Sequence, residues 1–222
     1  MIGAKVFTFM SAPNNLLFIY RQLRRQYGHP QDQWGLWCKR RKSLPEKEEV
    51  IIGAILTQRT NWRNVELAMA NLKRHKAGRL KTVYNLAKNN PRKLAMLIRS
   101  CGFYKTKVKY LKTAADFFIR NGGVKKISNR PLTKLRDELL QLHGVGPETA
   151  DSILLYALSK PIFVVDEYTR RLARQKSLAV KSLNYHHLQE FFTRRLPKSY
   201  QLYQDFHALI VVGGKDDRVS SG

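Results

Sequence analysis

The chain has 222 residues, of which 43% are hydrophobic, so it can bury a substantial core in one domain or in two closely packed ones. This content excludes a disordered chain held open by its charge. Forty-one lysines and arginines against 16 acidic residues give a formal net charge of +25, and residues 67–115 hold thirteen basic residues without an acidic one. The balance favours nucleic acid as the partner, because neutralised phosphates release condensed counterions. An anionic membrane surface is the alternative.

The cysteine content and the apolar runs indicate the compartment. Cys38 and Cys101 are far apart, form no disulfide framework or metal cluster, and suit a reducing environment. No apolar run is long enough to cross a bilayer, and the short run at residues 6–12 is a poor signal peptide. We expect an intracellular protein without a membrane partner.

Apolar residues recur at helical spacing along most of the chain. A charged, proline-punctuated segment at residues 31–49 is the best candidate for a domain boundary, and a helical stripe follows at 50–69. Further stripes occupy residues 94–98, 135–142 and 153–157, with breaks at 89–91, 121–123 and 159–161. The apolar run 162–165 has no strand-like partner, so it is predicted to be an extended entry into a helix. The sequence therefore predicts an all-α fold.

The stretch LHGVGPETA, residues 142–150, places two glycines between apolar runs. Pro147 suits the first position of a helix, where its missing N–H would have no partner anyway. Gly144 and Gly146 can adopt positive φ and leave their N–H groups uncovered, and the helix dipole adds to this anion site. We predict a hairpin that binds phosphate without sequence preference. The alternative is an ordinary tight connection between helices.

The stretch FVVDEYTRR, residues 163–171, ends an apolar run at Asp166, directly before a helical pattern. Asp is a favourable N-cap, so capping alone would explain this residue. A carboxylate at the end of a buried run, close in sequence to a phosphate-binding hairpin, could equally face a sugar. The residues alone leave both interpretations open.

In this order and at this separation, the hairpin and the aspartate resemble the helix-hairpin-helix (HhH-GPD) DNA glycosylases of the endonuclease III superfamily. The stretch IIGAILTQRTNWRNVE, residues 51–66, resembles the segment of that family that fills the gap left in the duplex. The resemblance covers roughly residues 45–212. It implies two helical subdomains with the DNA-binding and lesion cleft between them. The first is a six-helix unit at 39–160, and the second is formed by 1–38 together with 161–222.

The resemblance also implies roles for individual residues. In this family a base is flipped out of the stack and its bond to the sugar is cut. Asp166 matches the catalytic aspartate, which stabilises positive charge on the deoxyribose and orients or activates a water. Gln58 matches the gap-filling residue, although it could be an ordinary polar residue at a helix end. The other DNA-binding residues implied are Arg59, Gly144, Val145, Gly146 and Thr149.

Two departures from the family pattern are informative. Bifunctional members carry a lysine nucleophile where this chain has Glu148, and a carboxylate cannot form a Schiff base. The enzyme should therefore be monofunctional and leave an abasic site. The iron–sulfur cysteines of many relatives are absent from the sequence given, a feature of the 3-methyladenine branch. We expect no metal and no cofactor.

Aromatic residues suggest the substrate. Trp34, Trp37, Trp62 and His207 match regions around the lesion pocket, where electron-rich rings attract a cationic N-alkylated purine by about 0.5–2 kcal/mol. Core packing is the alternative for each tryptophan, and a structural hydrogen bond for His207. We predict a monomeric glycosylase that removes alkylated purines such as 3-methyladenine from damaged double-stranded DNA. The alternatives are a mismatch-specific uracil or thymine glycosylase and a non-catalytic helix-hairpin-helix module that only binds DNA.

Overall fold

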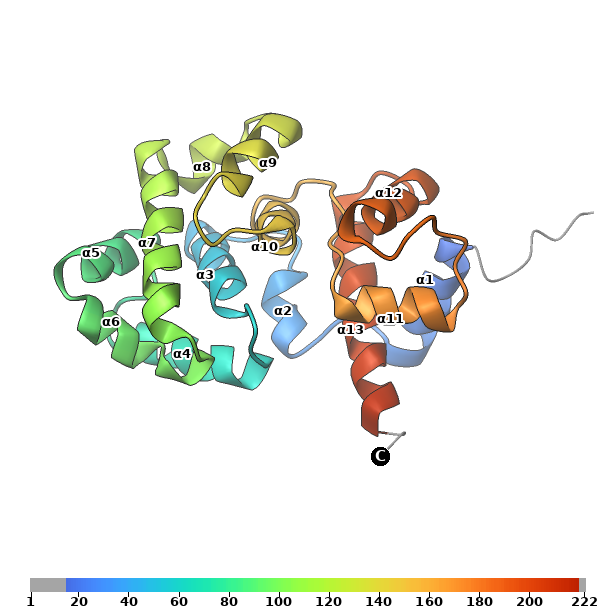
Figure 1. The fold of residues 1–222 in the computed structure, drawn as a ribbon, viewed down its shortest axis with the longest axis horizontal. Helices are drawn as coiled ribbons and strands as arrows, with labels where there is room; N and C mark the ends of the chain where they lie inside the picture. Colours follow the sequence, from blue (N-terminus) through green and yellow to red (C-terminus); the bar gives the residue numbers. More distant parts are fainter. Residues whose placement is uncertain (1–14, 220–222) are drawn as a thin grey trace, which may run out of the picture.

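The computed structural model describes residues 15–219 of the chain, and the side chains of residues 15–216. Within these bounds the protein consists of helices, turns and loops, without a β-strand, which confirms the predicted all-α class. Figure 1 shows two groups of helices, with the short helix α2 (Gln33–Trp37) between them. The run at residues 162–165 is buried and extended and leads directly into a helix, as predicted.

The first group lies on the left of Figure 1. Its helices are α3 (Leu44–Leu56), α4 (Trp62–Arg74), α5 (Leu80–Asn89), α6 (Pro91–Leu97), α7 (Tyr104–Arg120), α8 (Gly123–Ser128), α9 (Leu132–Leu140) and α10 (Pro147–Ser152). A 3-10 helix, η2 (Arg99–Cys101), precedes α7, and a π-helical segment, η3 (Ile153–Ala157), continues α10. The predicted number of six helices is wrong for residues 39–160. Eight α-helices occur there, because the breaks at 89–91 and 121–123 set off the short helices α6 and α8.

Helix α3 forms the centre of this group. All its residues from Val50 to Leu56 are buried, because α7, α8, α10 and η3 pack around them. The helix begins at Leu44, directly after the N-cap Ser43, whose backbone N–H donates to the Glu46 carboxylate at 2.7 Å, as in a capping box. Its end at Leu56 fixes the start of the turn that contains Gln58.

The second group lies on the right of Figure 1. It comprises α1 (Leu16–Tyr27), α11 (Glu167–Gln175), α12 (Tyr185–Arg195) and α13 (Tyr200–Val219). Helix α13 packs against α1, α11 and η3 and so connects the two groups. None of the helices in the described part of the chain combines the length and apolar character needed to cross a membrane. The division into residues 39–160 and 1–38 plus 161–222 stays a prediction, and residues 1–14 and 220–222 lie outside the described part.

A buried ionic network also joins the two groups. Asp151 of α10 is fully buried and accepts two hydrogen bonds from the Arg136 guanidinium of α9, at 2.7 and 3.0 Å. It accepts two more from Tyr185 and Gln189 of α12, each at 2.7 Å. Gln189 also donates to the backbone carbonyl of Phe163 at 2.6 Å. These contacts fix the orientation of α10 relative to the extended run that leads into α11.

Candidate active site

The glycine hairpin connects α9 to α10. Gly144 has a φ of +85°, and a Cβ added to it would lie 2.1 Å from Cδ1 of Tyr110, so glycine is required here. Gly146 has a φ of −88° and is the N-cap of α10. The expected freedom to adopt positive φ is therefore used at Gly144 alone. Pro147 begins α10, as predicted.

The beginning of α10 offers uncapped backbone donors. No side chain of the described residues caps this helix, and the first N–H groups of a helix have no intrahelical acceptor. Directly before it, the Val145 N–H donates to the Leu142 carbonyl at 3.0 Å. The donors at the hairpin are therefore suited to an anion at the start of α10.

Two of the residues predicted to contact DNA have buried side chains. The Val145 side chain is buried, and its N–H is already bonded within the turn. The Thr149 side chain is also buried, and its hydroxyl accepts a hydrogen bond from Gln58. Both side chains shape the hairpin from inside, and contact of these residues with DNA stays a prediction.

Gln58 is tied to the hairpin. It lies in the turn after α3, and its Nε2 donates to the Gly144 carbonyl at 2.8 Å and to Thr149 Oγ1 at 3.1 Å. The neighbouring Arg59 is exposed and has a φ of +52°. The turn after α3 and the glycine hairpin therefore meet at the Gln58 side chain.

Asp166 lies at the N-terminus of α11. Its Oδ1 accepts hydrogen bonds from the Thr169 N–H at 2.8 Å and the Thr169 hydroxyl at 3.0 Å, so the capping interpretation is correct. Its Oδ2 lies 3.5 Å from Nε2 of His207. Burial raises the pKa of Asp166, but His207 and the Thr169 hydrogen bonds outweigh it and hold the pKa below the usual value. The carboxyl is therefore a stable anion that can balance positive charge nearby.

His207 lies beside this carboxylate. Its side chain is buried, and its Nδ1 lies 2.7 Å from the hydroxyl of Tyr156. Its Nε2 has no hydrogen-bond partner among the described residues, since 3.5 Å to Asp166 is too long for a good one. The structural hydrogen bond expected for His207 is present, and the residue also faces Asp166.

The structure brings the three predicted tryptophans together. The ring of Trp37 lies 6.0 Å from Trp34 and 5.5 Å from Trp62, edge to face in both pairs. Trp34 and Trp37 also pack against Tyr156, at 5.7 and 5.1 Å. The buried indole N–H of Trp34 has no hydrogen-bond partner in the described part of the chain. These rings form one aromatic cluster, even though they come from three separate segments.

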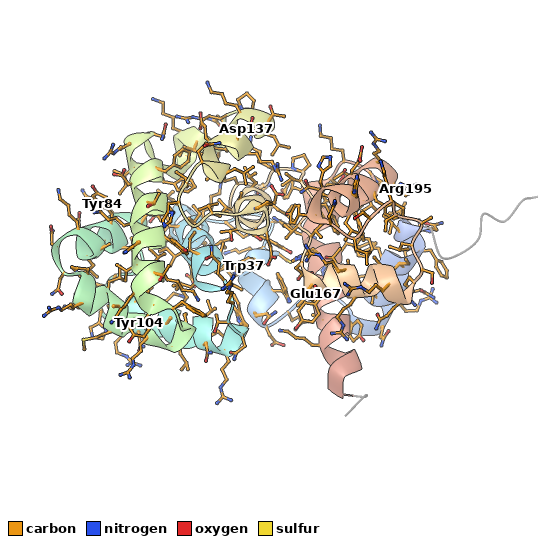
Figure 2. The ribbon with its side chains drawn as sticks, viewed as in Figure 1. Trp37, Tyr84, Tyr104, Asp137, Glu167 and Arg195 are labelled. Carbon is orange, nitrogen blue, oxygen red and sulfur yellow. The ribbon has the colours of Figure 1, made fainter. Side chains whose placement is uncertain are left out.

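The aromatic cluster and the carboxylate line one cavity of about 420 Å³. Its lining includes Trp34, Trp37, Gln58, Arg59, Trp62, Glu148, Thr149, Asp166, Glu167, His207 and Lys215. Figure 2 labels Trp37 of α2, which lies between the two groups of helices, and Glu167 of α11, which belongs to the second group; both contribute to this lining. Asp166 thus faces an open cavity and shares it with the first turn of α10.

A second cavity of about 660 Å³ shares part of its lining with the first, namely Gln58, Arg59, Glu148 and Thr149. It is bordered by the hairpin and by Phe103 and Lys107, which our sequence analysis missed. Phe103 precedes α7 with a φ of +46° and exposes 63% of its surface. A single aromatic after a glycine is a weak sequence signal, and only the fold brings it near Gln58.

Two further ionisable side chains line the 420 Å³ cavity. Glu148 is exposed overall, yet the protein removes enough solvent to raise the pKa of its carboxyl, and the charge of Asp166 adds to this. Lys215 donates to Gln33 Oε1 at 3.0 Å, and burial lowers the pKa of its amine. The described residues contain no cluster of three or more side chains suited to hold a metal.

A carboxylate beside an aromatic cavity, next to a glycine hairpin with free helix-end donors, defines a DNA glycosylase of the helix-hairpin-helix class. The family model described as HhH-GPD superfamily base excision DNA repair protein matches residues 52–198. The chain belongs to this superfamily, and thus to the DNA glycosylases, hydrolases that bind DNA in base excision repair.

Several relatives agree with this assignment. A protein of Methanocaldococcus jannaschii named as a DNA repair glycosylase is 40% identical over 196 residues, which are 87% of this chain and 84% of that protein. Endonuclease III of Thermotoga maritima is 32% identical over 57% of this chain and 54% of its own length. Among solved structures, the H. pylori 3-methyladenine DNA glycosylase MagIII, bound to 1,N6-ethenoadenine, has a TM-score of 0.75 and 27% identity. The match covers 91% of this chain and 98% of that one.

Proposed function

We propose that the protein is a monofunctional DNA glycosylase that flips alkylated purines, such as 3-methyladenine, into the 420 Å³ cavity and hydrolyses their N-glycosidic bond. The main support is the position of Asp166 on the wall of a cavity lined by tryptophan rings. The similarity to MagIII, named as a 3-methyladenine DNA glycosylase, also supports this substrate. Because both walls of the cavity come from one chain, we expect the protein to act as a monomer.

In this proposal, the start of α10 binds a phosphate of the damaged strand. Gln58 enters the space left in the duplex, and basic side chains offset the few kcal/mol needed to extrude the base. The tryptophan rings hold the extruded base, and a cationic alkylated purine gains attraction from their faces. Asp166 then stabilises the positive charge that builds on the sugar as the bond to the base breaks.

The side chains in the cavity support the proposed absence of lyase chemistry. Glu148 cannot form a Schiff base with the sugar. Lys215 is the amine among the described lining residues of this cavity, and it is hydrogen-bonded to Gln33. Borohydride should therefore trap no covalent adduct on a lesion duplex. A trapped band that disappears in Lys215→Ala would contradict the monofunctional assignment.

A panel of duplexes, each with one modified base, tests the substrate. The panel should contain 3-methyladenine, 7-methylguanine, 1,N6-ethenoadenine, and uracil or thymine opposite guanine, with base release scored after alkaline cleavage. We expect the fastest release from the alkylated purines. Faster release of uracil or thymine would favour the mismatch-specific alternative. Binding without release from any duplex would leave a DNA-binding module.

A further inference from the structure

Three carboxylates line the 420 Å³ cavity, and one of them, Glu167, is already paired with Arg174 at 3.1 Å. Glu148 and Asp166 share the rest of this cavity. Glu148 reaches it from the first turn of α10, and Asp166 from the start of α11. The two side chains differ in how they are held. Asp166 is fixed by Thr169 and faces His207, whereas the Glu148 carboxylate accepts no hydrogen bond from the described residues.

We propose that the two carboxylates divide the work of hydrolysis, with Asp166 stabilising the sugar cation and Glu148 accepting the proton of the attacking water. The inference rests on the proposed glycosylase function and assigns a further catalytic residue to it. In the reaction, the bond between C1′ and the base nitrogen breaks, and its electron pair leaves with the base. The water oxygen forms a bond to C1′, and one water proton moves to a carboxylate oxygen of Glu148 and then to solvent.

The division follows from what each role requires. A charge stabiliser should remain ionised and fixed in place, which suits Asp166, whose pKa is held low. A general base needs an accessible oxygen and a pKa closer to the working pH. The Glu148 side chain is exposed overall, which meets the first condition. Partial loss of solvent and the charge of Asp166 raise the pKa of its carboxyl, which meets the second. Two acids whose surroundings push their pKa values apart are a common basis for separate catalytic roles.

The charged groups around Glu148 set the expected pH dependence. Asp166 raises its pKa, whereas His207 of α13 and Arg170 of α11 oppose this shift. Arg59, from the turn after α3, lines the same cavity. The remaining charged groups in the lining are Glu167 and Lys215. The rate of base release should increase with pH as Glu148 loses its proton, with a midpoint above the usual glutamate value of about 4.3.

Glu148→Gln is the first test, using the duplex that the wild type cleaves fastest in the panel. We expect single-turnover base release to be slower by about 10²-fold, with the rising limb of the pH profile lost and duplex affinity equal or higher. Asp137→Asn, at an exposed position on α9, is the control for removal of one negative charge. The melting temperature shows whether each variant is folded.

Azide provides a second test that a structural role would not affect. Azide attacks C1′ without losing a proton, so it should restore base release to Glu148→Ala by at least about tenfold and yield a deoxyribosyl azide. It should not restore Asp166→Ala. Glu148→Gln activity within about twofold of the wild type, or no restoration by azide, overturns the inference. If the inference about Glu148 is overturned but Asp166→Asn is inactive in the same experiment, the proposed glycosylase function still holds. A wild type that releases no base from the panel overturns both.

Discussion

The two oxygens of Asp166 have different neighbours. Oδ1 accepts the capping hydrogen bonds from Thr169, whereas Oδ2 lies beside His207, so a substitution can affect the fold and the reaction to different extents. Asn is as favourable as Asp at an N-cap, so Asp166→Asn should stay folded, but the low pKa of the carboxyl means that its charge stabilises the fold at neutral pH, and the melting temperature should fall modestly there. The loss of negative charge beside the sugar should slow base release by about 10²- to 10³-fold. Duplex affinity should stay equal or increase, because one repulsive charge is removed. Single-turnover rates measure base release, and anisotropy titrations measure duplex affinity. Full activity in this variant would contradict the proposed mechanism.

The ionised Glu148 carboxylate in the cavity should lower the stability of the folded protein. Its raised pKa means that folding favours the protonated carboxyl. The stability that Glu148 contributes is therefore present below the pKa of the unfolded state, and it is lost as the pH rises through the pKa of the folded state. Glu148→Gln should therefore melt at a higher temperature than the wild type at pH 8. The difference should vanish near about pH 4. A lower melting temperature for the variant at pH 8 would show that the carboxylate is stabilising instead.

Individual residues differ in how far the sequence reveals them. Asp166 lies within a short motif and was identified as the catalytic candidate, whereas Glu148 was identified only as the residue at the position of the family's lysine nucleophile. His207 was assigned to the pocket only by resemblance, because its contact with Asp166 spans 41 residues of chain. The burial of the Thr149 side chain could not be predicted, because a motif gives residue order but not the direction of a side chain.

At the scale of elements, Lys107 joins two turns. Its side chain is only 2% exposed, and Nζ donates to the carbonyls of Leu56, at the end of α3, and Cys101, at the end of η2, at 2.8 and 2.7 Å. Leu56 lies two residues before Gln58, and Cys101 lies two residues before Phe103. Gln58 and Phe103 both border the second cavity. Lys107 therefore fixes both turns from inside the protein.

Lys107→Met should leave these two carbonyls without their donor. We expect a loss of about 2–4 kcal/mol in the free energy of unfolding, since each buried unsatisfied group costs about 1–3 kcal/mol. Urea titration measures this loss. Affinity for a lesion duplex should fall more than affinity for undamaged duplex, because Gln58 and Phe103 would lose their positions. Equal losses for both duplexes would mean that Lys107 supports the fold alone.

The hairpin glycines provide a matched pair of variants. Gly144→Ala places a Cβ against the Tyr110 ring at a φ of +85°, so we expect a loss of at least about 1–3 kcal/mol in the free energy of unfolding. Gly146→Ala meets no heavy atom within 4 Å at a φ of −88°, and its stability should change little. Thermal melts of the two variants make the comparison. Similar losses for both would show that backbone conformation is not the cause.

At the scale of the whole molecule, the net charge of +25 should make binding to undamaged duplex fall steeply with salt. Each phosphate contact adds about 0.9 to the slope of log affinity against log salt concentration. Lys105, Lys109 and Lys112 are exposed along α7, which borders the second cavity. Their replacement by glutamine should reduce the slope, by up to about three contacts. A flat salt response of the wild type would contradict the electrostatic interpretation of the charge.

The fold class could be predicted because helical spacing and glycine or proline breaks are local signals. The relative placement of the two groups of helices could not. It depends on contacts such as those of Asp151 with Tyr185 and Gln189, which are 34 and 38 residues away in the chain. The same limit applies to the aromatic cluster, whose rings come from α2, α4 and η3.

If Gln58 fills the gap in the duplex, as we propose, its hydrogen bonds should impose a threshold on the search for lesions. To enter a duplex, its amide must first leave the Gly144 carbonyl and Thr149, at a net cost of about 1–3 kcal/mol. An intact base pair offers no vacant site to compensate for that departure, so the side chain stays docked while the protein scans normal DNA. Only where pairing or stacking is already weakened does release become favourable, and undamaged bases are thereby spared most attempts at extrusion.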